Sequence, residues 1–416
     1  MKYLKKFSNH NGYDSFINTD KFIRPNVSIC KEELHVHLNH ILPHDYSNDY
    51  FTIESLEDNN DISIIYTNSS SNPMDLQSYP VYYSKNNGNW TLYSSTINLN
   101  TGDTLRLYSN LYVHYIISSD GKAEYYRRYS STKTCNIYGN IMSLFYQTEF
   151  NDKTQFNVSS SDHRPCCSMF YNSLKVIDAS NLILPSTLTE YCYDQMFQGC
   201  TSLITAPELP ATTLKKCCYY QMFKGCTSLK TAPELPATTL TTECYSRMFQ
   251  DCTSLTTAPE LPATTLANFC YYQMFYGCTS LTTAPELPAT TLTEYCYYGM
   301  FSDCTLLTTA PELPATTLAN YCYHTMFCRC TSLTTAPELP ATTLANYCYS
   351  SMFYGCTSLN SVMMLATNIS AYNCLNGWLT NVAESGTFIK DPSMTKLPSG
   401  SSGIPSGWVV QDYIES

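Results

Sequence analysis

Two patterns of apolar and polar positions divide the chain. Between residues 45 and 156, short runs rich in Tyr, Ile, Thr and Ser alternate with turn signals, of which Asn87-Gly88 and Thr101-Gly102 are clear examples. From residue 166 onward, cysteine, leucine and Met-Phe positions return every 26 residues instead. The first pattern predicts an all-β domain of the immunoglobulin-sandwich type, and the second predicts stacked repeat coils.

Each repeat unit reads C-Y-x-x-M-F-x-x-C-T-S-L-x-T-A-P-E-L-P-A-T-T-L-x-x-x. Leu214, Cys218, Met222 and Cys226 are four residues apart, which predicts one apolar stripe of a short helix, and Gly225 is placed to end that helix in a left-handed conformation. The prolines that follow predict an extended segment. One helix and one extended segment per unit is the plan of a leucine-rich-repeat solenoid.

These elements predict a multidomain α+β chain. We expect an N-terminal attachment segment over residues 1–44, the β-sandwich over 45–156, the solenoid over 166–365 and a C-terminal cap over 366–416. A degenerate repeat copy begins at Cys166, and Trp378 and Trp408 are expected to cover the last coil. Both ends of the solenoid are therefore predicted to be closed.

The composition narrows the choice of partners. Charged residues make up only 14% of the chain and the net charge is −11 with no basic block, which argues against nucleic acid and anionic membranes as partners. No apolar run approaches the ~20 residues of a membrane-spanning helix. Lys2, Lys5 and Lys6 are not followed by the apolar stretch of a signal peptide. We therefore expect synthesis in a reducing cytosol, where the 21 cysteines stay free and form two buried ladders.

No motif in the sequence predicts an enzyme or a cofactor. The chain has no phosphate-binding glycine loop, no G-x-S-x-G and no H-E-x-x-H. Two groups of metal-ligating residue types lack the paired spacing of zinc modules, so no metal site is predicted. They comprise His35, His37, His40 and His44 in one group, and Cys322, His324, Cys328 and Cys330 in the other.

One glutamate recurs at the same position of every complete repeat. Stacking would place these carboxylates in a row about 5 Å apart, where neighbours repel one another. We expect structural hydrogen bonds to offset that repulsion, with bound calcium as the less favoured alternative, because one Glu per coil offers few ligands. The glutamate ladder comprises Glu208, Glu234, Glu260, Glu286, Glu312 and Glu338.

The repeats differ from one another mainly around the Met-Phe pair. These variable positions are predicted to point outward, and several of them carry tyrosine, which supplies contact area and a hydroxyl at low entropic cost. They form either a solvated surface whose residues vary without functional consequence or a contact surface for a protein or glycan ligand. The candidate binding residues are Tyr220, Tyr272, Tyr276, Tyr298 and Tyr354.

The repeat consensus, with its M-F-x-G-C and C-T-S-L-x-T-A-P-E-L-P-A-T-T-L segments, resembles the BspA-like leucine-rich repeats of gut Bacteroidales and their phages. The closing segment, residues 365–410, and the opening residues MKYLKKF also resemble such proteins. The resemblance implies recognition or adhesion without enzymatic activity.

The leading functional prediction is a virion-exposed fibre or decoration protein of a gut phage. It would be made in the host cytoplasm, join other virion proteins through its N-terminal segment and bind a cell-surface ligand, with homo-oligomers possible. A bacterial cell-surface adhesin and an intracellular interaction scaffold are the alternatives.

Overall fold

The structure is a computed structural model, and it describes residues 4–8, 14–18, 45–68, 80–109, 115–117, 123–156, 164–172, 175–395 and 400–414. The chain divides into two units, Met1–Asp45 and Tyr46–Ser416. In the first unit, β1 (Leu4–Ser8) pairs antiparallel with β2 (Asp14–Asn18). The rest of the predicted attachment segment, with His35, His37, His40 and His44, lies outside the described residues.

The second unit opens with two β-sheets that follow the short 3-10 helix η2 (Tyr46–Asn48). One sheet has the order β7-β4-β10-β9, and the other has the order β12-β11-β3-β8-β5-β6. The strands contributed by this region are β3 (Phe51–Ser55), β4 (Asn60–Asn68), β5 (Val81–Lys85), β6 (Thr91–Leu92), β7 (Ile97–Leu99), β8 (Thr104–Ser109), β9 (Tyr115–Ile117), β10 (Ala123–Ser131) and β11 (Cys135–Asn140).

The two predicted turns lie between strands. The hairpin predicted at Asn87-Gly88 joins β5 to β6, and its central residues are Asn86 and Asn87, whose φ angles of 50° and 59° suit a type I′ turn. The turn at Thr101-Gly102 joins β7 to β8, which belong to different sheets. The region is thus almost entirely β, with one short helix, α2 (Ser143–Tyr146). The immunoglobulin type of the sandwich stays a prediction.

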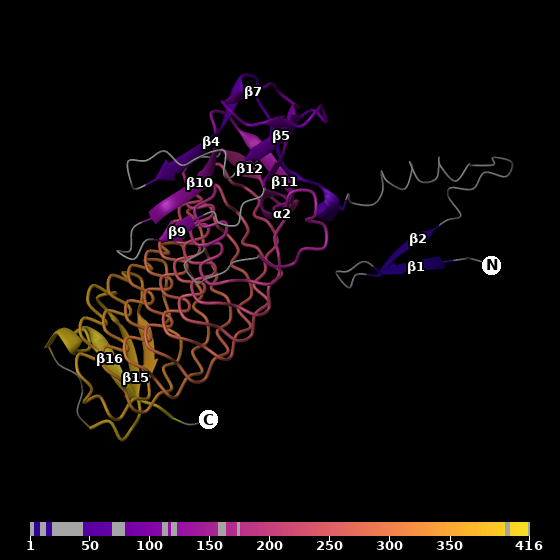
Figure 1. Ribbon diagram of the computed structural model, residues 1–416. Coiled ribbons are helices and arrows are strands. Elements are labelled where there is room, and N and C mark those ends of the chain that lie inside the picture. The colour runs from indigo at the N-terminus through magenta and orange to yellow at the C-terminus, as the bar shows by residue number, and fades with distance from the viewer. Residues whose placement is uncertain are drawn as a thin grey trace. The chain divides into compact units, whose positions relative to one another are not determined.

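The sheets continue directly into the repeats. Strands β12 (Val176–Asp178) and β13 (Leu182–Ile183) of the degenerate copy pair parallel with β11. The Phe51 ring lies 5.8 Å from that of Phe170, and one hydrophobic core runs from the sheets into the first coils. Figure 1 shows β11 and β12 at one end of the coil stack. The β region therefore covers the N-terminal end of the stack.

Successive repeat coils are joined by backbone hydrogen bonds in a constant register. Tyr219 N donates to Cys244 O at 3.1 Å and Phe223 N donates to Met248 O at 3.0 Å, and the same pairs recur along the stack. The extended Thr-Ala-Pro-Glu-Leu-Pro segments add isolated parallel bridges between equivalent threonines, such as Thr231 and Thr257. Their prolines prevent a continuous strand ladder.

The predicted helix of each repeat is wrong, and with it the α part of the predicted α+β class: no α-helix occurs between residues 175 and 395. The segment between the two cysteines is a chain of turns in which every fourth residue is left-handed, as at Cys217, Gln221 and Gly225 (φ 52°, 53° and 72°). Alternate N–H groups close turns or reach the next coil. The apolar period is four rather than 3.6, which fits this arrangement and not a helix.

The interior of the stack is built from identical residues in register. The Tyr219 and Tyr245 rings stack 5.7 Å apart, and buried phenylalanines form a second such row. All twenty cysteines of the described residues are buried free thiols. The two series with 26-residue spacing lie in the interior, where the inter-coil register places successive members side by side, as predicted. In the second ladder each thiol donates to a carbonyl of a preceding coil, as Cys226 Sγ does to Phe197 O at 3.1 Å.

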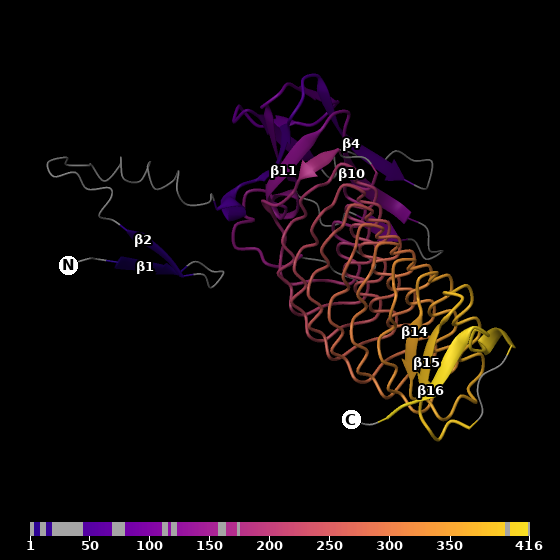
Figure 2. The same ribbon diagram turned by 180° about the vertical axis from the view of Figure 1, so that it is seen from behind.

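The C-terminal end is closed by a parallel sheet of β14 (Ser361–Met364), β15 (Gly386–Lys390) and β16 (Trp408–Asp412), with the 3-10 helix η3 (Gly400–Ser402) before its last strand. Figure 2 shows these strands side by side beyond the last coils. Both tryptophans are buried, as predicted, and Trp378 Nε1 donates to Ser402 O at 2.9 Å. The coil register continues past residue 365, because Phe353 N donates to Trp378 O.

Candidate functional site

The outer side of the turn segments forms a surface that we call the turn face. In each coil, Cys-Tyr and Met-Phe pairs point inward, and the two residues between successive pairs point outward, such as Tyr272 and Gln273. The residue just before the first cysteine lies on the same face, as Phe269 does. Equivalent outward residues of successive coils therefore form rows along the stack.

Two of these rows become aromatic in the C-terminal half of the stack. In the row just before the first cysteine, ring centroids are 4.5 Å, 4.6 Å and 4.5 Å apart from one coil to the next, with ring planes within 9° of parallel. A second row stacks Tyr272, Tyr298 and His324 at 4.8 Å and 4.6 Å. The aromatic patch comprises Phe269, Tyr272, Tyr295, Tyr298, Tyr321, His324, Tyr347 and Tyr372.

The aromatic patch is continuous across its two rows and is open to solvent. The ring centroids of Phe269 and Tyr272 are 5.8 Å apart, and those of Tyr321 and His324 are 5.7 Å apart. Tyr372, which is 66% exposed, meets Tyr347 edge-on at 5.3 Å. The other seven rings are partly buried. Because the rings within each row cover one another's faces, the surface presents mainly ring edges and tyrosine hydroxyls.

A row of amide and carboxyl side chains borders the aromatic patch. It occupies the position two before the first cysteine and holds Asn268, Glu294, Asn320 and Asn346. Backbone hydrogen bonds hold the rings next to this row. Each residue that carries a ring donates its backbone N–H to the carbonyl of the bordering residue in the next coil, as Tyr321 does to Asn346 at 3.0 Å. Asn320 Nδ2 donates to Glu294 Oε1 at 3.0 Å. Each coil thus offers one ring and one planar polar group.

The aromatic patch carries little charge. Desolvation lowers the pKa of His324 to about 4, so its imidazole is neutral near pH 7. Glu294 is the one charged side chain in the bordering row and the two aromatic rows between residues 268 and 373. At the next outward position along the coil, Arg329 forms an ion pair with Asp303. Arg247 marks the edge, with its guanidinium carbon 5.0 Å from the centre of the Tyr272 ring.

The N-terminal half of the turn face is different, since it is charged. The guanidinium carbon of Arg164 lies 3.7 Å from the centre of the Tyr191 ring, and Arg164 Nη1 donates to Asp194 Oδ2 at 3.3 Å. Burial raises the pKa of Asp194 to about 7, although Arg164 opposes that rise. Lys216 and Glu243 occupy nearby outward positions. The two halves of the turn face therefore offer a partner different chemistry.

The structure brings together two of the five tyrosines predicted as binding residues, Tyr272 and Tyr298. Tyr220 lies outside the aromatic patch, and its hydroxyl accepts a hydrogen bond from Arg247 Nη1 at 3.3 Å. Tyr276 and Tyr354 lie on the turn face one outward position further along the coil.

Four tyrosines of the aromatic patch, Tyr295, Tyr321, Tyr347 and Tyr372, were missing from the sequence prediction. Tyr295, Tyr321 and Tyr347 precede the first cysteine of their repeats, and the comparison of repeats centred on Met-Phe passed over that position. Their 26-residue spacing was the available signal.

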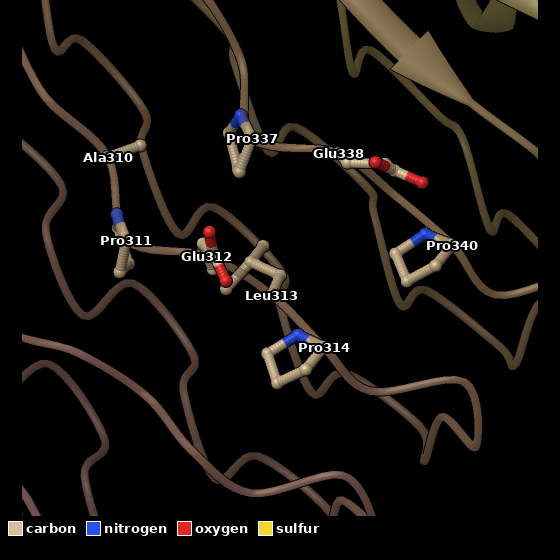
Figure 3. Close-up of a pocket in the computed structure, with 8 residues that line it drawn as sticks. All are labelled: Ala310, Pro311, Glu312, Leu313, Pro314, Pro337, Glu338 and Pro340. Carbon is tan, nitrogen blue, oxygen red and sulfur yellow. The ribbon is translucent and has the colours of Figure 1, made fainter. Parts of the chain in front are cut away.

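A second candidate surface is the Pro-Glu-Leu-Pro face, which carries the glutamate ladder. All six of its carboxylates are exposed, and no described residue donates a hydrogen bond to them, so the predicted structural hydrogen bonds are not found. A groove of about 440 Å³ lies between two coils there, lined by proline rings with Glu312 and Glu338 (Figure 3). Apart from the two carboxylates, its lining side chains are proline, alanine and leucine, so none of them donates a hydrogen bond near pH 7.

Metal ligands do not converge in the described part of the chain, where no group of three or more His, Cys, Asp or Glu side chains could hold an ion. Cys322 and Cys330 point into the core, while His324 stacks on Tyr298. Among the described residues, no helix is long and apolar enough to span a bilayer.

Comparison with known families agrees with this architecture. The family model of the BspA type leucine-rich repeat region (6 copies) matches residues 144–282, 193–333 and 249–379, which together cover more than half of the chain. The chain therefore belongs to the BspA-type leucine-rich-repeat family. Repeats of this family suggest a role in protein interaction or adhesion and are typically non-enzymatic. Searches of curated proteins and of solved structures give no match.

Proposed function

We propose that this chain is a non-enzymatic recognition or adhesion protein whose turn face binds a ligand on a cell surface. In this proposal the stacked coils form a solenoid, and the β region that precedes them is an immunoglobulin-type sandwich. The observation that carries the proposal is the exposed aromatic patch on repeats that are otherwise nearly identical. A coil needs no exposed tyrosine to fold, whereas partly exposed aromatic residues are typical anchors of interfaces.

The setting that we propose is the virion of a gut phage, where the chain is an exposed fibre or decoration protein attached through residues 1–44. This setting combines an adhesin-like repeat region with a cysteine-rich interior that suits synthesis in a reducing cytosol. A bacterial cell-surface adhesin and an intracellular scaffold are the competing settings. Antibodies against the full chain should label intact purified virions, and labelling only of bacterial envelopes or only of lysates would replace this setting with one of the other two.

The recognition function is tested with the full chain on a panel of intact gut Bacteroidales cells and on immobilised mucin. A variant changes the five predicted binding residues, Tyr220, Tyr272, Tyr276, Tyr298 and Tyr354, to serine. We expect wild type to bind a subset of the panel and the variant to bind at least about tenfold more weakly, since hot-spot aromatics dominate interfaces. Equal binding by both proteins would show that these tyrosines belong only to a solvated surface.

A further inference from the structure

We propose that the aromatic patch binds a neutral, repeating polysaccharide whose chain lies along the stacking direction of the coils. This inference rests on the proposed recognition function and specifies its ligand. It depends on three properties of the patch: its periodicity, its lack of charge and the polar groups that border it.

The periodicity of the patch favours a periodic ligand. From Phe269 to Tyr347, each coil offers the same pair of groups, a ring before the cysteine and a planar polar side chain before the ring. The rings repeat every 4.5–4.6 Å. A globular protein surface is aperiodic and is matched best by a different residue in each coil. A polysaccharide presents the same hydroxyls and ring edges once per sugar, and a row of identical groups can bind them in parallel.

The charge of the patch favours a neutral ligand. His324 is uncharged near pH 7, and Glu294 is neighboured by the amide of Asn320. Among the basic residues nearby, Lys216 and Arg247 lie at or beyond the N-terminal edge, and Arg329, one outward position beyond the rows, is paired with Asp303. A sulfated or uronic acid chain would need basic side chains along the rows. Sugars without charge need instead groups that both donate and accept hydrogen bonds, which tyrosine hydroxyls and asparagine amides do.

The ring geometry defines how such a chain would bind. Within the rows, ring faces cover one another, so sugars meet ring edges and hydroxyls rather than open faces. Tyr372 is the exception, because it turns 78° from Tyr347 and is mostly exposed. We expect one sugar to stack on the Tyr372 ring and the following sugars to form hydrogen bonds along Tyr347, Tyr321 and Tyr295.

The first part of the test passes the full chain through gels that contain laminarin, soluble starch, xylan or galactomannan, with heparin and polygalacturonate as acidic comparators. We expect at least one neutral polysaccharide, and neither acidic one, to retard the protein. Oligosaccharides cut from that polysaccharide are then titrated by calorimetry. Affinity should rise with each added sugar until the chain spans the four coils from Phe269 to Tyr347, and then level off.

The second part uses a variant that keeps the ring stacks and removes only hydroxyls, Tyr295→Phe with Tyr321→Phe and Tyr347→Phe. We expect about a tenfold or larger loss of affinity, because each hydroxyl contributes hydrogen bonds to the ligand. The matched control is Tyr83→Phe, which lies in β5 of the β region, outside the turn face, and should bind as wild type does.

Three results would overturn the inference: no neutral polysaccharide is retained, retention is the same in the triple variant, or affinity does not depend on chain length. If the protein binds cells through a protease-sensitive receptor instead, the ligand is a protein, and the proposed recognition function stands without the polysaccharide. If it binds neither cells nor polysaccharides, both proposals fail.

Discussion

The turn face and the Pro-Glu-Leu-Pro face are made by the same coils, yet they differ in how the repeats use them. On the Pro-Glu-Leu-Pro face, the exposed residues are almost as constant as those of the core, with the same glutamate in six successive coils. On the turn face, outward positions change from coil to coil, from the charged Lys216 and Glu243 to the aromatic Tyr295 and Tyr321. Backbone register and core packing are the same beneath both halves of the turn face.

This difference separates what builds the coil from what can distinguish a partner. The inward Cys-Tyr and Met-Phe pairs and the inter-coil hydrogen bonds define the coil without help from the outward residues of the turn face. Those residues are therefore free to vary with little effect on stability, since surface substitutions cost little. Ionising or truncating interior residues should therefore lower the free energy of unfolding most. Substitutions at the left-handed turn positions should lower it less, and substitutions on the Pro-Glu-Leu-Pro face should hardly change it.

The largest effect on stability should come from ionising the buried cysteine thiols at high pH. Burial raises the pKa of the Cys192 and Cys244 thiols to about 12, against an ordinary value of about 8.5 in the unfolded chain. Because the folded state holds these thiols protonated, the stability that they contribute is present below about pH 8.5 and is lost as pH rises towards 12. Each such thiol lowers the free energy of unfolding by roughly 1 kcal/mol per pH unit in that window.

We therefore expect the urea midpoint, measured by tryptophan fluorescence, to fall steeply between pH 8 and 10. Thiol titration of the denatured, non-reduced protein is the control, and it should find most of the 21 cysteines free. A flat pH profile, or a majority of cysteines in disulfides, would contradict the thiol ladders.

Truncating the buried tryptophan of the last coil should have the next largest effect. Trp378 is fully buried and donates a hydrogen bond to Ser402, so Trp378→Ala should lower the free energy of unfolding by about 3–5 kcal/mol. Tyr372→Ala, at a mostly exposed ring, is the matched control and should cost far less. Urea unfolding measures both, and equal effects would mean that Trp378 does not seal the stack.

A substitution at a glycine distinguishes the turn conformation from a helix, because it should lower stability in the first case and raise it in the second. Gly299 has a φ of 56°, and an added Cβ would meet Gln273 Cγ at 3.2 Å and Thr325 Oγ1 at 3.3 Å. Gly299→Ala should therefore destabilise the protein by about 1 kcal/mol. In a helix the same change would stabilise it by a similar amount. Ser351→Gly, at the equivalent left-handed position, is the control and should be close to neutral.

The smallest effect should come from the glutamate ladder. Changing Glu286, Glu312 and Glu338 together to glutamine should alter the free energy of unfolding by less than about 0.5 kcal/mol, because the carboxylates are exposed and well solvated. Urea midpoints with and without millimolar calcium measure this effect. A calcium-dependent rise in the wild type that the variant lacks would show that the ladder binds cations.

The features that were predictable from the sequence are those that repeat locally. The 26-residue register, the free thiols, the hairpin at Asn87-Gly88 and the burial of Trp378 all follow from residue type and spacing. The turn conformation could not be predicted, because non-glycine residues such as Tyr191 and Gln195 occupy left-handed positions. These residue types do not favour that conformation, so the sequence gives no sign of it. The pairing of β11 with β12 and β13 is non-local and left no sequence signal.

The candidate site was only partly predictable for a related reason. Tyr272 and Tyr298 were found by comparing the residues next to Met-Phe, and that comparison rested on an outward helix face. In the turn arrangement the residue before the first cysteine also points outward, which adds Tyr295, Tyr321 and Tyr347 to the same surface. The error in local conformation thus led directly to the missing residues.

The central claim, that recognition belongs to the turn face and not to the constant face, is tested by comparing two triple variants of the full chain. One changes Tyr295, Tyr321 and Tyr347 to serine, and the other changes Glu286, Glu312 and Glu338 to glutamine. Binding to the same panel of intact gut Bacteroidales cells is measured for both variants and for wild type. We predict that the tyrosine variant loses binding at least about tenfold while the glutamine variant binds as wild type does. Loss of binding in the glutamine variant, with binding retained in the tyrosine variant, would contradict the claim.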